Sequence, residues 1–404
     1  MITYLGLSHL SLCYAASALK KGYRVNIFDF EKSINLFKNK KNIFENNLDK
    51  ILLKYRNNLS ITSNFNKIKS SKIIFLAQDL ETDRLNKPNQ IKIKKLIKKI
   101  HRYKNKKVLV VMSQVPVTFC RKLNWNKKNL YHFVETLIFG QGVKRAMNPE
   151  RIVLGKNSSG QKIHPGLRRF LMAYRCPLIE MTYEESELTK AYINIFLASQ
   201  LTTTNYLNEL SQKFGADWSK IKAALVLDKR ISKYSYLNPG LGISGGNIER
   251  DLVSIGLIKK RNKLDYSLII KFISISNKNK SWPFLKIKKF LKKKTVVGIL
   301  GFTYKENTIS YKNSPSIAAI SKIKKSRCII HDAKSNLLDC KNKYKFVNLN
   351  EVLLRSNAII IFHKNTQYKK IKFSKYSNIK AIVDPFKIVD KKNLNIKKQK
   401  YFNL

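Results

Sequence analysis

The chain is short of acidic residues: it has 25 Asp and Glu against 80 Lys and Arg, a formal net charge of +55 at pH 7. So large an excess would suit a nucleic-acid-binding protein, whose affinity comes mainly from neutralising phosphates. The lysines, however, are spread through almost every segment, together with many Asn and Ile. All three residue types have A/T-rich codons, so a genome of that composition accounts for the charge without a polyanionic partner. We expect nucleic-acid binding that is at most non-specific.

Cysteines are also few. The five are Cys13, Cys120, Cys176, Cys328 and Cys340. Their odd number and the lack of CxxC spacing predict neither a disulfide framework nor a metal site, as in a reducing cytoplasm. Residues 1–19 carry no charge, but a signal peptide would normally open with basic residues. No later apolar run approaches the ~20 residues of a membrane span, so we expect a soluble, cytoplasmic protein.

What the sequence does contain is an alternation of strand-like and helix-like segments. With 404 residues, 44% of them hydrophobic, the chain is globular and long enough for two or three domains. An apolar run over residues 2–5 meets Gly6, after which a helical pattern reaches Lys21. A second apolar run over 25–28 ends at Asp29. This order is typical of the βαβ unit that opens a dinucleotide-binding fold.

The glycine fingerprint of that fold is only partly present. In GxGxxG the first Gly makes a tight turn, the second lets the backbone approach a pyrophosphate, and the third allows close packing. Here these positions are Gly6, Ser8 and Ser11, and the acid that would bind the ribose is Asp29. Ser8 places a hydroxyl where phosphates should pass. By itself the motif is therefore as compatible with a plain α/β packing turn as with an NAD site.

The rest of the chain continues the alternation. Strand-like runs cover 73–77, 108–112 and 151–155, with helical patterns near 43–55 and 90–103. Strands that alternate with helices predict a parallel, doubly wound sheet. From Glu184 the pattern becomes one long helix, which ends near Gly215 before a second helix from Asp217. A loop with four glycines, NPGLGISGGNIERD, follows at 238–251, and further strand-like runs lie at 295–304, 328–332, 357–363 and 381–384.

Several motifs resemble, in the same order, those of the UDP-glucose/GDP-mannose dehydrogenase family. VETLIFGQGVKRAMNPERIVLG (134–155) is similar to its PEFLREGxAxxDxxxPDRIVIG, and ELTKAYINIFLASQ (187–200) to its ExTKxxxNxFLA helix. NPGLGISGGNIERD corresponds to GxGYGGSCFPKD, and GFTYKENTISYKNSPS (301–316) to GLAFKxxTDDxRxSP. The resemblance covers nearly the whole chain.

The resemblance implies an α/β fold with two doubly wound Rossmann-like domains joined by a central helical domain that contains a long helix. We expect an N-terminal NAD-binding domain at 1–182 and a central helical domain at 183–285, with the glycine-rich loop and a dimerisation role. A C-terminal nucleotide-sugar-binding domain would follow at 286–404. A homodimer is expected from the long central helix of the family.

The activity that the resemblance implies is NAD-dependent oxidation of the C6 alcohol of a UDP- or GDP-linked hexose, first to an aldehyde and then to a carboxylate. Neither the sugar nor its base can be chosen from the sequence. The implied catalytic residues are Glu135, Lys190, Asn194 and Asp251, with Asn247 at the position of the family's cysteine. The implied cofactor-binding residues are Gly6, Ser8, Ser11, Asp29 and Ser113. The implied substrate-binding residues are Arg230, Gly240, Gly242, Gly245, Gly246, Arg250 and Lys305.

Asn247 is the departure with the largest chemical consequence. In the family a cysteine at this position attacks the aldehyde, and an amide nitrogen cannot serve as that nucleophile. The chain could then perform efficiently only the alcohol-to-aldehyde half. Two alternatives remain at this stage: a catalytically inactive binding or partner subunit beside an active relative, and a basic nucleic-acid-associated protein.

Overall fold

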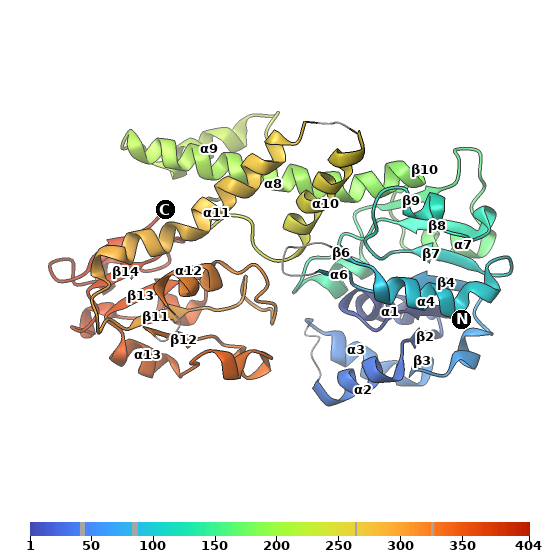
Figure 1. Ribbon diagram of the computed structural model, residues 1–404, viewed down its shortest axis with the longest axis horizontal. Coiled ribbons are helices and arrows are strands. Elements are labelled where there is room, and N and C mark those ends of the chain that lie inside the picture. The colour runs from blue at the N-terminus through green and yellow to red at the C-terminus, as the bar shows by residue number, and fades with distance from the viewer. Residues whose placement is uncertain (41–44, 83–87, 263–264, 325–326) are drawn as a thin grey trace. The chain divides into compact units, whose positions relative to one another are not determined.

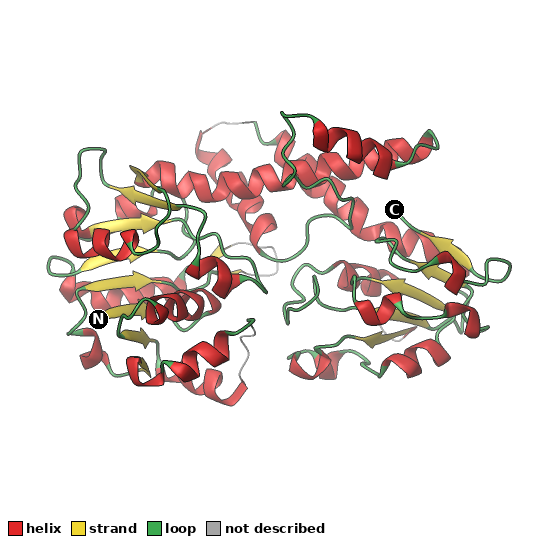
Figure 2. Cartoon of the chain, turned by 180° about the vertical axis from the view of Figure 1, so that it is seen from behind, coloured by secondary structure: helices red, strands yellow, loops and turns green. Residues whose placement is uncertain are grey.

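The computed structural model describes residues 1–40, 45–82, 88–262, 265–324 and 327–404. The chain divides into two compact units, Met1–Ile193 and Asn194–Leu404. Each unit contains one large sheet with helices on both of its faces (Figures 1 and 2). The long helix α8 (Tyr183–Lys213) begins in the first unit and continues into the second. The described residues include no helix that is both long and apolar enough to cross a membrane.

The sheet of the first unit has eight strands in the order β10-β9-β8-β7-β4-β1-β2-β3. All neighbouring strands are parallel except β8 and β9. The strands are β1 (Ile2–Leu5), β2 (Val25–Phe28), β3 (Leu59–Thr62), β4 (Ile73–Leu76), β7 (Val108–Val111), β8 (Leu130–Phe133), β9 (Ile152–Lys156) and β10 (Leu178–Thr182). A separate two-stranded hairpin joins β5 (Glu81–Thr82) to β6 (Pro88–Asn89). The parallel sheet predicted from the alternating pattern is confirmed.

The helices of the first unit cover both faces of this sheet because the buried strands are apolar on both sides. Side chains of α1, α3, α6 and α7 form one core with the sheet, and those of α4 and α5 belong to a second core. The helices are α1 (His9–Lys20), α2 (Glu31–Lys40), α3 (Leu48–Lys54), α4 (Ile91–Ile100), α5 (Phe119–Lys122), α6 (Gly142–Met147) and α7 (Pro165–Met172). The helical pattern expected over 43–55 is shorter, since α3 begins at Leu48, and residues 43 and 44 lie outside the described residues.

The sheet of the second unit has five parallel strands in the order β12-β11-β13-β14-β15. They are β11 (Val297–Leu300), β12 (Cys328–His331), β13 (Ala358–Ile361), β14 (Ala381–Val383) and β15 (Lys400–Phe402). The helices of this unit, besides most of α8, are α9 (Trp218–Leu227), α10 (Asn247–Asn262), α11 (Ser267–Ile287), α12 (Pro315–Ile323), α13 (Leu349–Arg355) and α14 (Thr366–Lys369). The second α/β unit expected from the later apolar runs is therefore confirmed.

Both sheets open with the same backbone arrangement. After β1, Gly6 has φ +96°, and its N–H donates to the carbonyl at the end of β2. After β11, Gly301 has φ +95°, and its N–H donates to the carbonyl at the end of β12. The acid that follows each second strand, Asp29 or Asp332, accepts the next backbone N–H of the turn at 2.7 Å. The two units therefore share a Rossmann-type first crossover.

Candidate active site

Gly6 forms the turn at the carboxyl end of β1, as the fingerprint requires. Its φ of +96° favours glycine, and a Cβ at this position would lie 2.7 Å from Cβ of Gln78. Ser113, at the carboxyl end of β7, accepts a hydrogen bond from the Gln78 N–H at 2.9 Å. The carboxyl ends of β1, β4 and β7 therefore meet around Gln78, at the edge where open α/β sheets bind their ligands.

Ser8 and Ser11 form a reciprocal capping box at the start of α1. The Ser8 N–H donates to Oγ of Ser11 at 2.9 Å, and the Ser11 N–H donates to Oγ of Ser8 at 3.3 Å. The Ser8 hydroxyl also donates to the carbonyl of Ala77 at 2.6 Å. The two serines that replace fingerprint glycines thus stabilise the helix and fix it to the end of β4.

Asp29 lies fully buried at the end of β2. Its carboxylate accepts the N–H groups of Leu7 and Phe30, each at 2.7 Å, and pairs with Nζ of Lys92 at 2.8 Å. The acid stands where a ribose hydroxyl would be bound. The Gly6 turn and this acid fit a dinucleotide, whereas the N–H groups at the start of α1 are already bonded to side chains of the chain itself.

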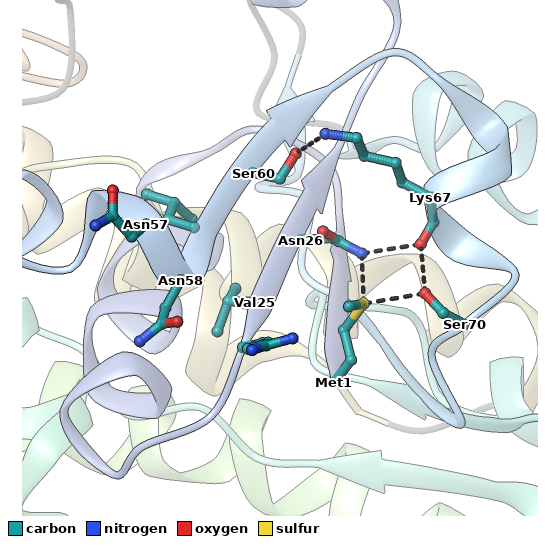
Figure 3. Close-up of a pocket in the computed structure, with 10 residues that line it drawn as sticks. Met1, Val25, Asn26, Asn57, Asn58, Ser60, Lys67 and Ser70 are labelled. Atoms are coloured by element: carbon teal, nitrogen blue, oxygen red, sulfur yellow. Dashed lines mark hydrogen bonds between the residues drawn. The ribbon is translucent and has the colours of Figure 1, made fainter.

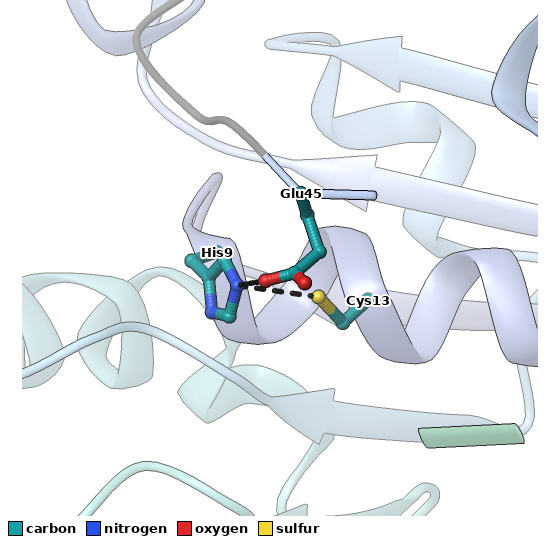
Figure 4. Close-up of side chains that lie close together, drawn as sticks. All are labelled: His9, Cys13 and Glu45. Atoms are coloured by element: carbon teal, nitrogen blue, oxygen red, sulfur yellow. Dashed lines mark hydrogen bonds and ion pairs between the residues drawn. The ribbon is translucent and has the colours of Figure 1, made fainter. Parts of the chain in front are cut away.

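A cluster that the sequence reasoning missed lies beside this turn (Figure 4). Nε2 of His9 is 2.6 Å from Oε2 of Glu45 and 3.6 Å from Sγ of Cys13, and all three side chains are buried. Glu45 also accepts the N–H groups of Gly140 and Gly142, each at 3.0 Å. The spacing of His9 and Cys13 by one helical turn was visible in the sequence, but nothing there pointed to Glu45.

The surroundings of this cluster shift the pKa of two of its side chains in opposite directions. Burial raises the pKa of the Glu45 carboxyl, but the hydrogen bond and charge of His9 and the two backbone N–H groups outweigh it and lower the pKa overall. Burial, together with the nearby carboxylates of Glu45, Asp79 and Glu135, holds the pKa of the Cys13 thiol well above its ordinary value. Through Glu45 the cluster links the first turn of α1 to the backbone at Gly140 and Gly142.

Glu135 and Lys190 form an ion pair inside the first unit. Nζ of Lys190 is 2.7 Å from Oε1 of Glu135 and donates to its backbone carbonyl at 2.8 Å. Both side chains are largely buried. Oε2 of Glu135 accepts the Leu137 N–H at 2.9 Å, which fixes the carboxylate in the loop after β8. Two of the catalytic residues implied by the resemblance are thus in direct contact.

Asn194 and Asp251 are brought together in the second unit. The Nδ2 group of Asn194, on α8, donates to Oδ2 of Asp251, on α10. Nε of Arg250 lies 3.6 Å from Oδ1 of the same carboxylate. All three side chains are buried. The fifth catalytic position, Asn247, is the exposed first residue of α10.

The glycine-rich loop lies against α11 and the turn after β11. Gly242 has φ +79°, and a Cβ there would be 2.5 Å from the carbonyl oxygen of Ser276. The Asn313 amide donates to the carbonyls of Ile243 and Gly245, each at 3.2 Å. A Cβ at Gly245 would touch the Tyr304 ring. The conformation of the loop therefore requires glycine for two reasons: the positive φ of Gly242 and Gly245, and the lack of room for a side chain at both positions.

The remaining predicted binding residues differ in their surroundings. Gly240 donates its N–H to Asn205 at 2.8 Å and has open space around its Cα, whereas a Cβ at Gly246 would approach the Lys312 side chain. Nζ of Lys305 lies over the Tyr304 ring. Arg230 is exposed and pairs with Asp228 at 2.7 Å. The structure therefore supports the glycine-rich segment as a packed loop but leaves Arg230 on the surface.

Lys280, on α11, is a further buried charge that the sequence reasoning missed. Its amine donates to Oδ1 of Asn313 and lies 3.6 Å from Oε2 of Glu249. Burial lowers its pKa, and Glu249 partly offsets this effect. Asn313 in turn donates to two carbonyls of the glycine-rich loop. Lys280 is therefore linked to the loop through Asn313. Ser276, four residues before Lys280 on the same helix, accepts the N–H of Ile243 in this loop at 2.8 Å. The sequence shows that Ser276 and Lys280 are one helical turn apart, but it does not show which segment they contact.

Two cavities lie at other places in the units. One of about 410 Å³ is at the edge of the first sheet where β1 and β2 begin, opposite to Gly6 (Figure 3). It is lined by Met1, Arg24, Val25, Asn26, Asn57, Asn58, Leu59, Ser60, Lys67 and Ser70. Another, of about 640 Å³, adjoins the carboxyl end of β12 and includes Asp332, Lys341 and Tyr344. None of the predicted site residues lines either cavity.

Two Rossmann-type sheets, with a dinucleotide turn and its acid in the first, are typical of a nucleotide-binding oxidoreductase. The chain belongs to the UDP-glucose/GDP-mannose dehydrogenase family. The NAD binding domain of that family matches residues 1–168, its central domain matches 184–279, and its UDP binding domain matches 298–395. The family predicted from the motifs is confirmed, and NAD is the cofactor of its first domain.

Known proteins similar to the chain agree with this assignment. The UDP-glucose 6-dehydrogenase of Rickettsia bellii is 27% identical, over 97% of this chain and 95% of that protein. The UDP-glucose 6-dehydrogenase TuaD of Bacillus subtilis is 26% identical over 63% of this chain and 57% of its own length. Among solved structures, a UDP-glucose dehydrogenase from Pyrobaculum islandicum has a TM-score of 0.83 at 20% identity and covers 99% of this chain and 96% of its own. A UDP-D-ManNAc dehydrogenase from Pyrococcus horikoshii has a TM-score of 0.82 at 17% identity, with coverage of 100% and 99%. These structures share the fold.

Proposed function

We propose that the protein oxidises the C6 alcohol of a nucleotide sugar to the aldehyde and does not carry out the second oxidation efficiently. The observation that carries this proposal is that the implied polar catalytic residues are present and paired, while the position of the family's cysteine holds no thiol. Glu135 and Lys190 are paired, Asn194 and Asp251 are bonded, and Asn247 stands at the start of α10 where the family has its cysteine. NAD supplies the hydride acceptor when it is bound. The alcohol gives up a hydride and a proton, and no thiol is needed for that step.

The paired residues suit the first oxidation. An alcohol that loses a hydride needs a partner for its hydroxyl proton and a positive or donor group for the oxygen. Lys190 can supply the charge, because its amine is held at 2.7 Å from Glu135 rather than free in solvent. Asn194 lies one helical turn further along α8 and is oriented by the Asp251 carboxylate. We assign the oxygen-binding role to these two α8 side chains.

The second oxidation is where the chain departs from its family. An aldehyde must first become a tetrahedral adduct before it can release a hydride, and a thiolate is the usual nucleophile. Asn247 offers only an amide. In the second unit the two cysteines, Cys328 and Cys340, are buried in the core of the C-terminal sheet. They support the interpretation that no cysteine of this unit substitutes for the missing thiol.

The stoichiometry of NADH tests the proposal. The wild-type protein is incubated with UDP- and GDP-linked hexoses, and NADH is counted per sugar consumed. One NADH and an aldehyde product are expected, and Asn247→Cys is expected to release two with a carboxylate product. Lys190→Met is expected to lower kcat/KM for the first step by about 10²-fold or more, which is typical of a lost proton-transfer or oxyanion group. Two NADH per sugar from the wild-type protein would contradict the proposal.

The alternative is a catalytically inactive subunit that binds a partner. The same Asn247 position favours it, and so does the bonded state of the α1 N-terminus. It predicts no NADH from any nucleotide sugar, before or after Asn247→Cys, together with co-purification of an active dehydrogenase. Calorimetry with NAD and UDP-sugars separates the two, because the inactive subunit would bind neither.

We also propose that the assembly is a homodimer formed through α8. Phe196, Tyr206 and Leu210 on α8, with Phe214 directly after it, are exposed, and the last three recur every fourth residue. Residues at this spacing lie on one face of a helix. Phe214 is 81% exposed and Phe196 is 70% exposed, which is costly for aromatic side chains unless another chain covers them. This stripe supports a second copy as the covering partner.

A further inference from the structure

The backbone N–H groups at the start of α1 donate to side-chain oxygens of the chain itself. Leu7 donates to Asp29 at 2.7 Å, Ser8 to Ser11 at 2.9 Å, and Ser11 to Ser8 at 3.3 Å. His9, the first residue of the helix, donates to Oδ2 of Asp79 at 3.0 Å. In a dinucleotide-binding fold, N–H groups at this position point at the diphosphate of the cofactor. Here they already have partners.

Of the four side chains that accept these N–H groups, only Asp29 and Asp79 are acidic, and only Asp79 is exposed to solvent. It follows β4 by three residues, so it stands at the same sheet edge as Gly6. Asp29, the other acid, is buried and compensated by Lys92. Asp79 is exposed, and its carboxylate receives the first N–H of α1, where the helix dipole favours an anion. An internal carboxylate thus occupies the place of an external phosphate.

Three carboxylates gather near the first turns of α1, although the whole chain is strongly positive. The carboxylates of Glu45, Asp79 and Glu135 all lie close enough to act on the Cys13 thiol in the first turns of α1. Only 25 acidic residues occur in the chain. Glu45 is bonded to His9 and Glu135 is paired with Lys190, whereas Asp79 bonds the first N–H of α1 itself, so the Asp79 carboxylate is the one that a diphosphate at this helix end would have to displace.

An independent observation that supports a ligand at this turn is a buried acceptor beside Gly6. Gln78, next to Asp79, is buried, and its Oε1 has no hydrogen-bond partner among the described residues. This oxygen lies 2.8 Å from where a Cβ of Gly6 would be, so it faces the glycine turn. A buried acceptor without a donor costs about 1–3 kcal/mol. A ligand hydroxyl or amide at the turn would satisfy it.

We propose that Asp79 is an internal competitor of the cofactor's diphosphate: its carboxylate holds the His9 N–H at the start of α1 and must leave before a diphosphate can bind there. The inference rests on the proposed function in one respect, since its ligand is the cofactor NAD. It goes beyond that function because it assigns to one residue the control of cofactor affinity. Asp79 is an affinity-determining residue, and it is not assigned a chemical step.

Binding measurements with Asp79→Asn test this inference without any turnover. The dissociation constants of NADH and ADP-ribose are measured by fluorescence and calorimetry for wild type and variant. The neutral amide removes the charge from the helix end and from the path of the phosphates. Both ligands are expected to bind about fivefold more tightly, the size of a charge effect at an exposed helix terminus. The gain should shrink at high salt, because exposed charges are screened.

A matched variant and a ligand without phosphate complete the test. Asp49→Asn removes an equally exposed acid from the first turn of α3 in the same unit, and it should leave both dissociation constants unchanged. Adenosine should bind wild type and Asp79→Asn alike. Equal affinities of wild type and Asp79→Asn for ADP-ribose, or an equal gain for adenosine, would overturn the inference. A tighter Asp79→Asn that oxidises no sugar would leave it standing and refute the proposed function instead.

Discussion

The side chain of Asn194 donates a hydrogen bond to the carboxylate of Asp251, and this bond joins two buried polar groups 57 residues apart in sequence. It links α8 to α10, the helix that begins at the glycine-rich loop. Arg250 lies beside the same carboxylate at 3.6 Å. Because a buried carboxylate is costly unless its oxygens are bonded, the pair stabilises the second unit whether or not it also takes part in catalysis.

Removing the amide should therefore destabilise the protein. Asn194→Ala leaves the Asp251 carboxylate buried with one fewer donor, and we expect the free energy of unfolding to fall by about 1–3 kcal/mol. Chemical denaturation followed by circular dichroism measures this change. Gln212→Ala, at an exposed position near the end of the same helix, is the control and should change stability by less than about 0.5 kcal/mol. Equal effects of the two substitutions would show that the bond contributes nothing.

The glycines of the loop should differ sharply in their tolerance of a side chain. Gly242 has φ +79°, and a Cβ added there would lie 2.5 Å from a backbone carbonyl oxygen. Gly242→Ala should therefore lower the free energy of unfolding by about 2 kcal/mol or more, because of backbone strain and steric overlap. Gly240 has open space, and Gly240→Ala should be neutral or stabilise by about 0.4–1 kcal/mol. Thermal unfolding of the two variants side by side distinguishes them. A tolerated alanine at position 242 would contradict the loop conformation.

Stability should fall below neutral pH because of His132. Burial, with a smaller effect of the Lys190 charge, lowers the pKa of His132 to about 3, and its Nδ1 is 2.8 Å from the Ser186 hydroxyl. In the unfolded chain the imidazole of His132 takes up a proton near pH 6.5, whereas in the folded chain it stays neutral down to about pH 3. Stability from this residue is therefore complete above pH 6.5 and is lost as pH falls, by up to about 1.4 kcal/mol per pH unit.

The variant His132→Gln removes this proton uptake. Between pH 6.5 and pH 5, its free energy of unfolding should fall less steeply than that of wild type when both are measured by urea titration. His101→Gln, at a partly exposed position after α4, serves as the matched control and should keep the wild-type slope. Parallel curves for wild type and His132→Gln would mean that His132 is not kept neutral in the folded state.

Charge on the exposed stripe of α8 should separate the two copies. Phe196→Glu together with Phe214→Glu places carboxylates on the face that we propose to be covered by a second chain, and burying them unpaired would cost several kcal/mol. Sedimentation velocity should show a dimer for wild type and a monomer for the double variant. Leu285→Glu, an exposed position on α11, is the control for added charge and should remain dimeric. A wild-type monomer at micromolar concentration would rule out the proposed dimer.

Much of the fold could be predicted from periodicity alone. The apolar runs that became β1, β2, β4 and β7 are short and bounded by glycine or polar residues, so their strand character depends on local sequence. The long helix α8 was equally clear. The antiparallel pairing of β8 with β9 was not predictable, because pairing direction depends on where the chain returns to the sheet rather than on the residues of the strands.

The site was less accessible to sequence reasoning, for a physical reason. Motif order brought Glu135, Lys190, Asn194 and Asp251 to attention, and the structure pairs them within each unit. Asp79 and Lys280 had no such signal, because a single acid or lysine in a sequence carries no information about which distant N–H or carbonyl it will meet. The three-domain boundaries expected at 182 and 285 remain predictions beside the two compact units observed.

The serine capping box at the start of α1 has a consequence for how this chain can change over generations. Because Ser8 and Ser11 satisfy each other's N–H groups, the helix is complete without any cofactor. A domain that folds without its ligand can lose affinity for that ligand and still be a stable protein. Folding of α1 and affinity for the cofactor therefore depend on partly different residues: the serines cap the helix, while Asp79 also lies in the place of a phosphate.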